Sequence, residues 1–464
     1  MPETPLADAV DAFLADPGTT FTVPGHKRSP ALAPGPMQFD LPLVSGADDS
    51  RLGRDVLGKA ERLAARLWGA DVCRFSVAGS THGNQAFALA VGRPGDRVIV
   101  ARTLHKSLFA GLVLAGLHPE WVRPQVDPAT GLATGVPVDE VEAALRRAPG
   151  ARAVFLVEPS YVGMLSDVEA IAGAAHATGV PLVVDQAWGA HLGFHPDLPA
   201  NALRRGADGL VTSTHKNLTA FTQGSIILAR SGLIDLDRLD EAFEMLHTTS
   251  PAAAIMASSD RARALMEERG EELLGRTIEI VAAAKHRLRE IAGLQVIDAS
   301  DPTKLVLALP GTGADGFAVE ADLFAKGVRF EMADRDTLVP IVTLADTETS
   351  VGRLAELLEL SIADRRGDPR PVAASTVWSL APETVLSPRD AYFARRERVA
   401  EERAVGRVAA ETAAPYPPGI PALAPGERIT AEILDGLRAE AAAGSRIAYC
   451  SDPTLQTLLV VADG

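Results

Sequence analysis

The chain has 464 residues, of which 47% are hydrophobic, and it carries a formal net charge of −15 at pH 7. This length and composition are those of a globular protein with a large core and two or three domains. The negative charge argues against nucleic acid or an anionic membrane as a partner, because both attract basic surfaces. Two cysteines, Cys73 and Cys450, are too few and too far apart for a disulfide framework or a thiolate metal site.

The start of the chain predicts an arm with no fold of its own. Residues 1–49 contain a Pro- and Gly-rich stretch, which needs another surface to become ordered. The first ten residues lack the basic and apolar run of a signal peptide, and no uncharged apolar stretch approaches the length of a membrane span. We therefore expect a cytoplasmic protein.

Short β-branched apolar runs alternate with amphipathic helical stretches from about Gly46 to Arg230. This alternation predicts an α/β domain with a mainly parallel sheet. The expected strands are short and continuously apolar, as strands covered on both faces are. They are Cys73–Val77, Arg97–Ala101, Ala153–Val157, Leu182–Asp185, Gly209–Ser213 and Ser225–Ala229.

The pattern beyond residue 250 predicts a second, smaller unit. A helical stretch, about Pro251–Ile291, leads into an α/β-like region with expected strands at Leu305–Leu309 and Val328–Glu331. We predict a large domain at residues 50–292 and a smaller C-terminal α/β domain at residues 293–464.

A possible phosphate site lies between an expected strand and a helix. Gly79 lets the backbone close on a phosphate, the helix N-terminus offers N–H donors, and Ser80 and Thr81 add hydroxyls. Such a turn is common, so it gains weight only together with other residues. His105 also follows a strand, where it fits either a place against an aromatic cofactor or a purely structural role.

Two further strand ends carry an acid and a lysine. Ligands of an open parallel sheet bind at the carboxyl ends of its strands. Asp185 ends a buried strand and can keep a pyridinium nitrogen protonated, so that the ring accepts electrons from a bond breaking at Cα. A helix cap is the alternative role for this residue. Lys216 ends the segment Ser213–Lys216 at the same edge, and the pair predicts a site for pyridoxal phosphate (PLP).

Other motifs are set aside on physical grounds. The near match to a P-loop, Gly53–Ala60, lacks both the final hydroxyl and a preceding strand. His191 and His195 have the spacing of a zinc pair, but Gly193 and Pro196 disfavour a helix there and no nearby acid completes the ligand set. We expect no metal site, and without a GxGxxG motif we expect no dinucleotide site.

These segments together resemble a known family. Taken in order along the chain, the segments given at the end of this paragraph closely resemble those of the ornithine/lysine/arginine decarboxylases of PLP fold type I, in the aspartate aminotransferase superfamily. The matches span about residues 20–430 and are highly specific in combination. They are Pro24–Lys27, Gly79–Thr81, Leu104–Ser107, Asp185–His191, Ser213–Lys216, Thr248–Pro251 and Pro415–Pro421.

The resemblance implies a fold, an activity and a set of site residues. The fold is a large domain with a mainly parallel seven-stranded sheet flanked by helices, plus a smaller C-terminal α/β domain. The activity is PLP-dependent decarboxylation of arginine, lysine or ornithine. PLP is then held as a Schiff base on Lys216, with Asp185 at the pyridine nitrogen and His105 against the ring. The remaining cofactor-binding residues are Gly79, Ser80, Thr81, Ala187, Ser213 and His215.

The resemblance also implies an assembly. The family is built from dimers whose active sites lie between subunits; we therefore expect a homodimer with shared active sites here, with a higher oligomer also open. This would explain the arm and the Thr248–Pro251 loop as parts of a neighbouring subunit's site. The arm's alternative role is a strap on its own subunit.

The sequence departs from the family at three places. The family commonly has Asp-Glu-Ala where this chain has Gln186 after Asp185, Thr-Glu where it has Leu41 and Pro42, and a tyrosine where it has Ala253. None of these changes removes a recognised PLP ligand. They leave the identity of the substrate open.

Other functions remain to be separated from decarboxylation. An aminotransferase or an oxidative deaminase can be built on the same frame, and a transaminase would clamp the α-carboxylate with an arginine, for which Arg329, Arg335 and Arg389 are candidates. A non-catalytic regulatory homologue is disfavoured because Lys216 and Asp185 are both retained.

Overall fold

The fold is taken from a computed structural model. It describes residues 2–15, 23–29, 31, 35–41, 43, 55–372, 377, 380–416 and 419–463. No helix in these ranges is both long and apolar enough to cross a membrane.

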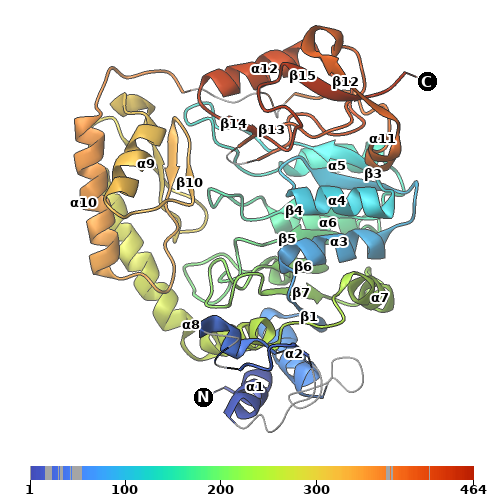
Figure 1. The fold of residues 1–464 in the computed structure, drawn as a ribbon, viewed down its shortest axis with the longest axis vertical. Coiled ribbons are helices and arrows are strands. Elements are labelled where there is room, and N and C mark those ends of the chain that lie inside the picture. Colours follow the sequence, from blue (N-terminus) through green and yellow to red (C-terminus); the bar gives the residue numbers. More distant parts are fainter. Residues whose placement is uncertain are drawn as a thin grey trace.

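A seven-stranded sheet forms the centre of the large domain (Figure 1). Its strands are β1 Val72–Ser76, β2 Arg97–Ala101, β3 His118–Val122, β4 Val154–Val157, β5 Leu182–Asp185, β6 Gly209–Thr212 and β7 Ser225–Ala229. The order is β1-β7-β6-β5-β4-β2-β3, and only β7 runs antiparallel to its neighbours. The predicted mainly parallel sheet is confirmed. Strand β3 was not predicted because it contains Pro119; it lies at the edge of the sheet, where a strand tolerates proline.

Helices cover both faces of this sheet. They are α2 Asp55–Trp68, α3 Gly79–Val91, α4 Lys106–Ala115, α5 Val138–Arg147, α6 Val168–His176 and α7 Leu236–Leu246, with the short 3-10 helix η2 Ala202–Arg205. Successive strand residues point to opposite faces and so join different cores. In β4, Val154 and Leu156 pack with α2, α5 and α6, whereas Phe155 packs with α3, α4 and α7. Burial on both faces explains why these strands are continuously apolar.

One long helix connects the large domain to the next unit (Figure 1). This helix, α8 Ala253–Leu288, has 36 residues and therefore spans about 54 Å. Its first half, including Met256 and Met266, lies in the core of the large domain, and its second half, including Val281 and Leu288, lies in another core. The helix thus belongs to two hydrophobic cores at once.

A four-stranded antiparallel sheet forms the second unit, in the order β10-β11-β9-β8. Its elements are β8 Gln295–Ile297, β9 Val306–Ala308, η3 Pro310–Thr312, α9 Gly316–Ala325, β10 Met332–Ala333, β11 Thr337–Val339 and α10 Glu348–Asp364. The strand predicted at Leu305–Leu309 is confirmed as β9. The strand predicted at Val328–Glu331 is wrong, because Val328 and Phe330 pack their side chains on this core while ladder pairing starts only at Met332.

A third unit with its own core follows near the C-terminus. It contains α11 Pro388–Phe393, β12 Arg396–Ala400, η5 Glu401–Arg403, β13 Ala414–Tyr416, α12 Ala431–Ala442, β14 Arg446–Ala448 and β15 Thr457–Val461. Strands β12 and β15 form one small sheet, and β13 and β14 form another. Both of these later units lie inside the predicted smaller domain at residues 293–464, whose boundaries stay a prediction.

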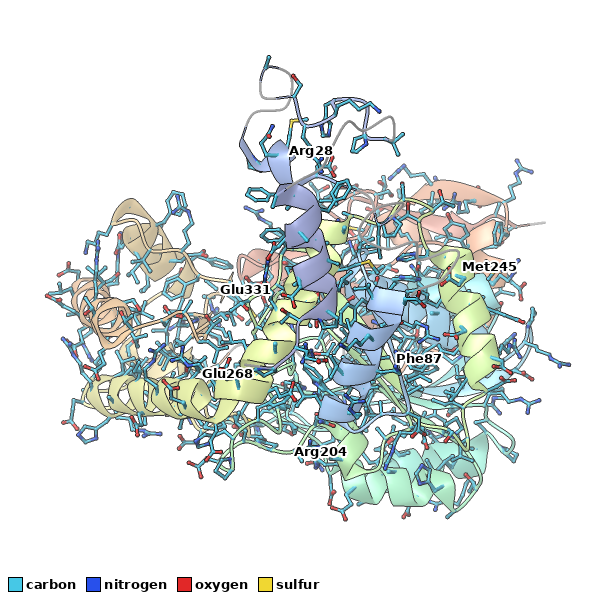
Figure 2. All side chains as sticks on the ribbon, turned by 90° about the horizontal axis from the view of Figure 1, so that it is seen from below. Arg28, Phe87, Arg204, Met245, Glu268 and Glu331 are labelled. Carbon is cyan, nitrogen blue, oxygen red and sulfur yellow. The ribbon has the colours of Figure 1, made fainter. Side chains whose placement is uncertain are left out.

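The first helix of the arm packs on its own subunit. Leu6, Ala7 and Val10 of α1 Pro5–Ala15 are buried against α8, and the amides of Leu6 and Ala7 donate to Oδ2 of the buried Asp260. A short 3-10 helix, η1 Gly35–Phe39, follows later in the arm. Figure 2 shows Arg28, which lies between these two helices in the sequence, at the end of α1, and its guanidinium is 5.0 Å from the ring centroid of Phe13.

A buried ion pair joins the third unit to the sheet. Arg102 follows β2, and its guanidinium contacts both carboxylate oxygens of Glu427 at 2.5 and 2.8 Å. The same guanidinium donates to the carbonyls of Pro421 and Ala422 and lies 4.7 Å from the ring centroid of Trp121. Both charged side chains are completely or almost completely buried. Four of the five N–H donors of Arg102 are therefore used in holding the third unit.

We predict that Arg102→Ala strongly destabilises the protein, because it leaves Glu427 buried without its counter-ion. The loss in the free energy of unfolding, measured with urea, should be about 3–5 kcal/mol. Arg428→Ala is the matched control, since Arg428 pairs with Glu383 on the surface and should cost under about 1 kcal/mol. Equal losses in the two variants would contradict the importance given to the buried pair.

Candidate active site

A cavity of about 490 Å³ lies at the carboxyl ends of the parallel strands, and all three units contribute to its walls. This is the edge at which an open parallel sheet binds ligands. The cavity brings together every residue that the sequence predicted for the site. These residues are Gly79, Ser80, Thr81, His105, Asp185, Ala187, Ser213, His215 and Lys216.

Asp185 ends β5 and is 4% exposed. Its Oδ1 accepts from the amide of Ala187 at 3.1 Å, and its Oδ2 accepts from Nδ2 of Asn84 at 2.6 Å. The first contact is the local turn expected of a capping acid. The second comes from α3 and fixes the direction in which the carboxylate points.

The same hydrogen-bond chain continues to His105. Nδ2 of Asn84 also donates to Oγ of Ser107 at 2.9 Å, and that hydroxyl lies 2.8 Å from Nδ1 of His105. His105 is the N-cap of α4, so the capping role and the place beside the cavity occur together. Burial lowers the pKa of His105, and the nearby lysines lower it further against the opposing charge of Asp185. The imidazole is thus favoured in its neutral form.

Lys216 lies in the turn after β6. Its Nζ is 4.1 Å from the ring centroid of Trp188, which also lines the cavity. Burial lowers the pKa of Lys216, whereas the charges of Asp185 and Glu331 oppose that shift. A lysine with a lowered pKa has more of the neutral amine that attacks carbonyl groups.

The start of α3 has the features of an anion site. Its N-cap, Ala78, offers no side-chain hydrogen bond, so the first N–H groups of the helix lack a cap from that residue. Gly79 has φ +68°, and no atom lies within 4 Å of the place where a Cβ would be. The hydroxyls of Ser80 and Ser213 lie 2.7 Å apart beside this turn. Backbone and hydroxyl donors therefore meet at one end of the cavity.

His215 has a defined ring orientation. Its Nδ1 lies 2.8 Å from the carbonyl of Gly224, which only accepts, so Nδ1 carries a proton. Burial lowers the pKa of His215. In the neutral ring Nε2 is then an acceptor, and His215 can donate to an anion only after Nε2 is protonated as well.

Several cavity residues were missed by the sequence analysis. They are Trp188, Tyr161, Asp334, Glu440, Ser445 and Tyr449. Trp188 stands inside the quoted segment Asp185–His191, so its position was available as a signal. Tyr161 follows β4, at the strand edge where ligands bind, so its position was also available as a signal. Asp334, Glu440, Ser445 and Tyr449 lie far along the chain, near short strands, helices and turns that carry no recognisable motif. Asn84, in the helix after Gly79, was given no role in the sequence-based prediction.

The departure at Gln186 has a structural explanation. Its Nε2 donates to the carbonyl of Gly189 at 2.8 Å, and its Oε1 accepts from the amide of Ala202 at 2.9 Å. The side chain is buried and takes no part in lining the cavity. The change from the family's glutamate therefore affects the loop after β5 and leaves the cavity wall unchanged.

The arm and the loop at Thr248–Pro251 do not line this cavity in the described part of the chain. They contact each other instead, through Leu43 N to Pro251 O and Ala253 N to Leu41 O, both at 2.9 Å. Predictions that fall on residues 21–22, 30, 32–34, 42 and 44–49 lie outside the described residues.

Comparisons with known proteins identify the family. Sequence models of the Orn/Lys/Arg decarboxylase major domain and C-terminal domain match residues 4–308 and 372–447. An arginine decarboxylase of Halalkalibacterium halodurans is 33% identical, over 99% of this chain and 98% of that protein. The chain belongs to the ornithine/lysine/arginine decarboxylase family. Members of this family depend on PLP, so the predicted family, cofactor and reaction class, decarboxylation of a basic amino acid, are confirmed.

Solved structures agree on the fold. A lysine decarboxylase of Francisella novicida has a TM-score of 0.86 at 20% identity and covers 99% of this chain and 81% of its own. A serine palmitoyltransferase variant of S. paucimobilis, solved with bound PLP and myriocin, has a TM-score of 0.54 at 14% identity over 66% of this chain and 76% of its own. The predicted PLP fold type I is confirmed.

We predict that Lys216 reacts with acetic anhydride at lower pH than an exposed lysine does. The reagent attacks the neutral amine, and burial lowers the pKa of Lys216. In cofactor-free protein, the rate of Lys216 acetylation followed by mass spectrometry should rise at lower pH than that of the exposed Lys326. Asp185→Asn should move the Lys216 midpoint lower still, because the carboxylate charge raises this pKa. A Lys216 midpoint at or above that of Lys326 would contradict the assigned environment.

Proposed function

We propose that this decarboxylase acts on arginine, releasing CO₂ and agmatine, with PLP held by the nine cavity residues predicted from the sequence. The observation that carries the site assignment is the single cavity in which Lys216, Asp185, His105 and the start of α3 meet. Arginine is supported by the name of the relative that is 33% identical over nearly the whole of both chains.

The residues of the cavity fit PLP. The start of α3, with Ser80, Thr81 and Ser213, offers donors to a phosphate, and Asp185 offers a fixed carboxylate to a pyridine nitrogen. His105 is open to the cavity, as a residue against a flat ring must be. When bound, PLP supplies an electron-accepting ring for the charge left when the Cα–carboxylate bond breaks.

Each protein group has one task in this proposal. Lys216 would hold PLP covalently through Nζ, and the lowered pKa that burial gives this lysine favours the neutral amine that such a bond requires. Asp185 holds the proton on the ring nitrogen, and Asn84 holds Asp185. His105, tied to Ser107, presents a neutral imidazole to the ring face. Trp188 and Tyr161, whose ring centroids are 5.1 Å apart, form an apolar wall that excludes water.

The described structure gives little support to an aminotransferase function, because the candidate arginines are not placed to bind an α-carboxylate. Arg389 donates to the carbonyls of Val113 and Leu114, and the guanidinium of Arg329 lies 4.9 Å from the ring centroid of Phe324. Neither arginine lines the cavity, whereas Arg335 lines it but is paired with Asp336. None of the three is placed as a free clamp for an α-carboxylate.

The test of this function is product analysis. The PLP-loaded protein, given arginine, lysine and ornithine separately, should release CO₂ and agmatine fastest from arginine. Asp185→Asn should keep PLP but lower kcat about 10²–10³-fold, because the amide cannot stabilise the protonated ring. A keto acid in place of an amine, or unchanged turnover in Asp185→Asn, would contradict the proposal.

We also propose a dimer with shared active sites, and a cytoplasmic location. The dimer is supported by residues 23–29 of the arm, which line no part of their own subunit's cavity. The well-packed α1 is the part of the arm that acts as a strap on its own subunit.

We predict that two inactive variants complement each other in mixed dimers. Lys216→Ala chains mixed with chains lacking residues 23–29 should regain about a quarter of the wild-type activity, because half of the dimers are mixed and each has one intact site. Lys216→Ala mixed with Asp185→Asn is the matched control and should regain nothing, since both changes lie in the same subunit's cavity. Mixed dimers that form and stay inactive would refute the shared site.

A further inference from the structure

We infer that Asp334 and Glu440 form the subsite for the distal guanidinium of the substrate. This inference rests on the proposed function, because it assigns the end of the same cavity that holds Lys216. The two carboxylates come from different units. Asp334 lies in the turn between β10 and β11, and Glu440 lies near the end of α12.

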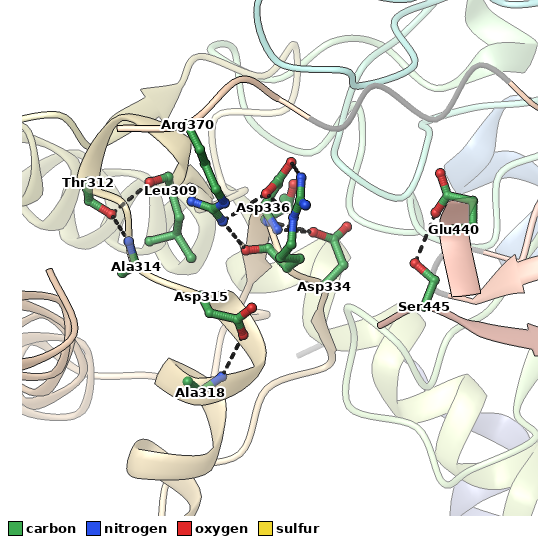
Figure 3. Close-up of polar contacts among 12 residues, drawn as sticks. Leu309, Thr312, Ala314, Asp315, Ala318, Asp334, Asp336, Arg370, Glu440 and Ser445 are labelled. Atoms are coloured by element: carbon green, nitrogen blue, oxygen red, sulfur yellow. Dashed lines mark hydrogen bonds and ion pairs between the residues drawn. The ribbon is translucent and has the colours of Figure 1, made fainter. Parts of the chain in front are cut away.

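Hydrogen bonds fix one carboxylate oxygen of Asp334 and leave the other without a partner among the described residues. Its Oδ1 accepts from the amides of Asp336 and Thr337 at 2.8 and 2.6 Å, which fixes the carboxylate on the turn. Its Oδ2 makes no hydrogen bond to any described residue. Figure 3 shows the carboxylate of Asp334 turned away from Arg370, toward the side on which Glu440 lies.

Glu440 likewise has one carboxylate oxygen that is hydrogen-bonded and one that is not. Its Oε2 accepts from Oγ of Ser445 at 3.0 Å, and Ser445 lines the cavity beside it. Its Oε1 has no hydrogen-bond partner among the described residues. Each carboxylate is therefore positioned by one oxygen and leaves the other for a ligand.

The neighbouring cations are already engaged elsewhere. Arg335 donates to both oxygens of Asp336 at 3.0 and 3.1 Å, and Arg370 donates to Oδ1 of Asp336 at 2.8 Å (Figure 3). Asp336 is thus compensated by two guanidinium groups. Asp334 has no such direct pairing, and burial together with the charges of Asp336 and Glu440 raises the pKa of Asp334 to about 6.

The position along the cavity suits a long side chain. Among the acids of these two units, Glu331 is the one whose charge acts on Lys216, and it accepts from the hydroxyl of Tyr161 at 2.9 Å. Asp334 and Glu440 line the parts of the cavity wall that the second and third units contribute, whereas Lys216 lines the part from the large domain. A substrate joined to the cofactor near Lys216 would extend past Tyr161 and place its terminal group between Asp334 and Glu440.

The geometry favours a guanidinium over an ammonium. A guanidinium is planar and has five N–H donors, so it can reach two carboxylates from opposite edges. An ammonium is a compact charge that prefers its hydration shell. Two fixed carboxylates on different units therefore select both the charge and the flat shape of the ligand.

The test uses agmatine, which carries the guanidinium but has no carboxylate to lose. Calorimetry on the PLP-loaded protein should show agmatine binding weakened about 10–100-fold in both Asp334→Asn and Glu440→Gln. Glu432→Gln, on the exposed face of α12, is the matched control and should bind agmatine as the wild type does. With arginine as substrate, the two variants should raise KM far more than they lower kcat.

A neutral analogue separates charge from shape. Citrulline, an uncharged isostere of arginine, should bind weakly to the wild type and lose little further affinity in the two variants. If both variants fold, keep PLP and bind agmatine as tightly as the wild type, the subsite is refuted while the proposed function stands. If the wild type fails to make agmatine from arginine, the proposed function fails, and agmatine affinity still decides the subsite.

Discussion

The buried contact between Arg102 and Glu427 sets the geometry on which the cavity depends. Arg102 directly follows β2, three residues before His105, and it grips the third unit through Glu427, Pro421 and Ala422. The same unit supplies Glu440 and Tyr449 to the cavity wall. Removing two charges from water is costly, so the pair stabilises only as a complete set of contacts. The contact between Arg102 and Glu427 therefore fixes how the third unit is positioned against the sheet.

The chemistry of the cavity follows from a second constraint, the common edge at which parallel strands end. Asp185 and Lys216 come from neighbouring strands β5 and β6, and the hydrogen-bond chain through Asn84 and Ser107 joins Asp185 to His105. Burial lowers the pKa of Lys216 and of His105, whereas the charge of Asp185 acts in the opposite direction on both. One fixed carboxylate therefore tunes the groups around it.

The fold and one end of the cavity could be predicted from the sequence because both depend on local patterns. Apolar runs of strand length located six of the seven strands of the large sheet, and the residues that follow them line one end of the cavity. Strand β3 was missed because Pro119 and Glu120 break its apolar pattern. Residues 328–331 were wrongly predicted as a strand because Val328 and Phe330 are strand-favouring residues that pack on the core. The backbone of this segment pairs with no other strand before Met332.

The far end of the cavity could not be predicted, because distant segments meet there only in the folded chain. Asp334 and Glu440 are single acids in a chain with 60 of them, and no local spacing distinguishes them. Their place depends on the turn after β10, on α12 and on the contact at Arg102. Tertiary structure alone separates them from the solvated acids of the surface.

The origin of the cavity walls from three separately packed units has an evolutionary consequence. The large domain carries the residues that we propose hold the cofactor, whereas the units after α8 line the remaining part of the cavity. Changes in those later units can be inherited without disturbing the core around Lys216. A lineage can therefore explore new substrates by drift in one part of the gene while selection preserves the reaction in another.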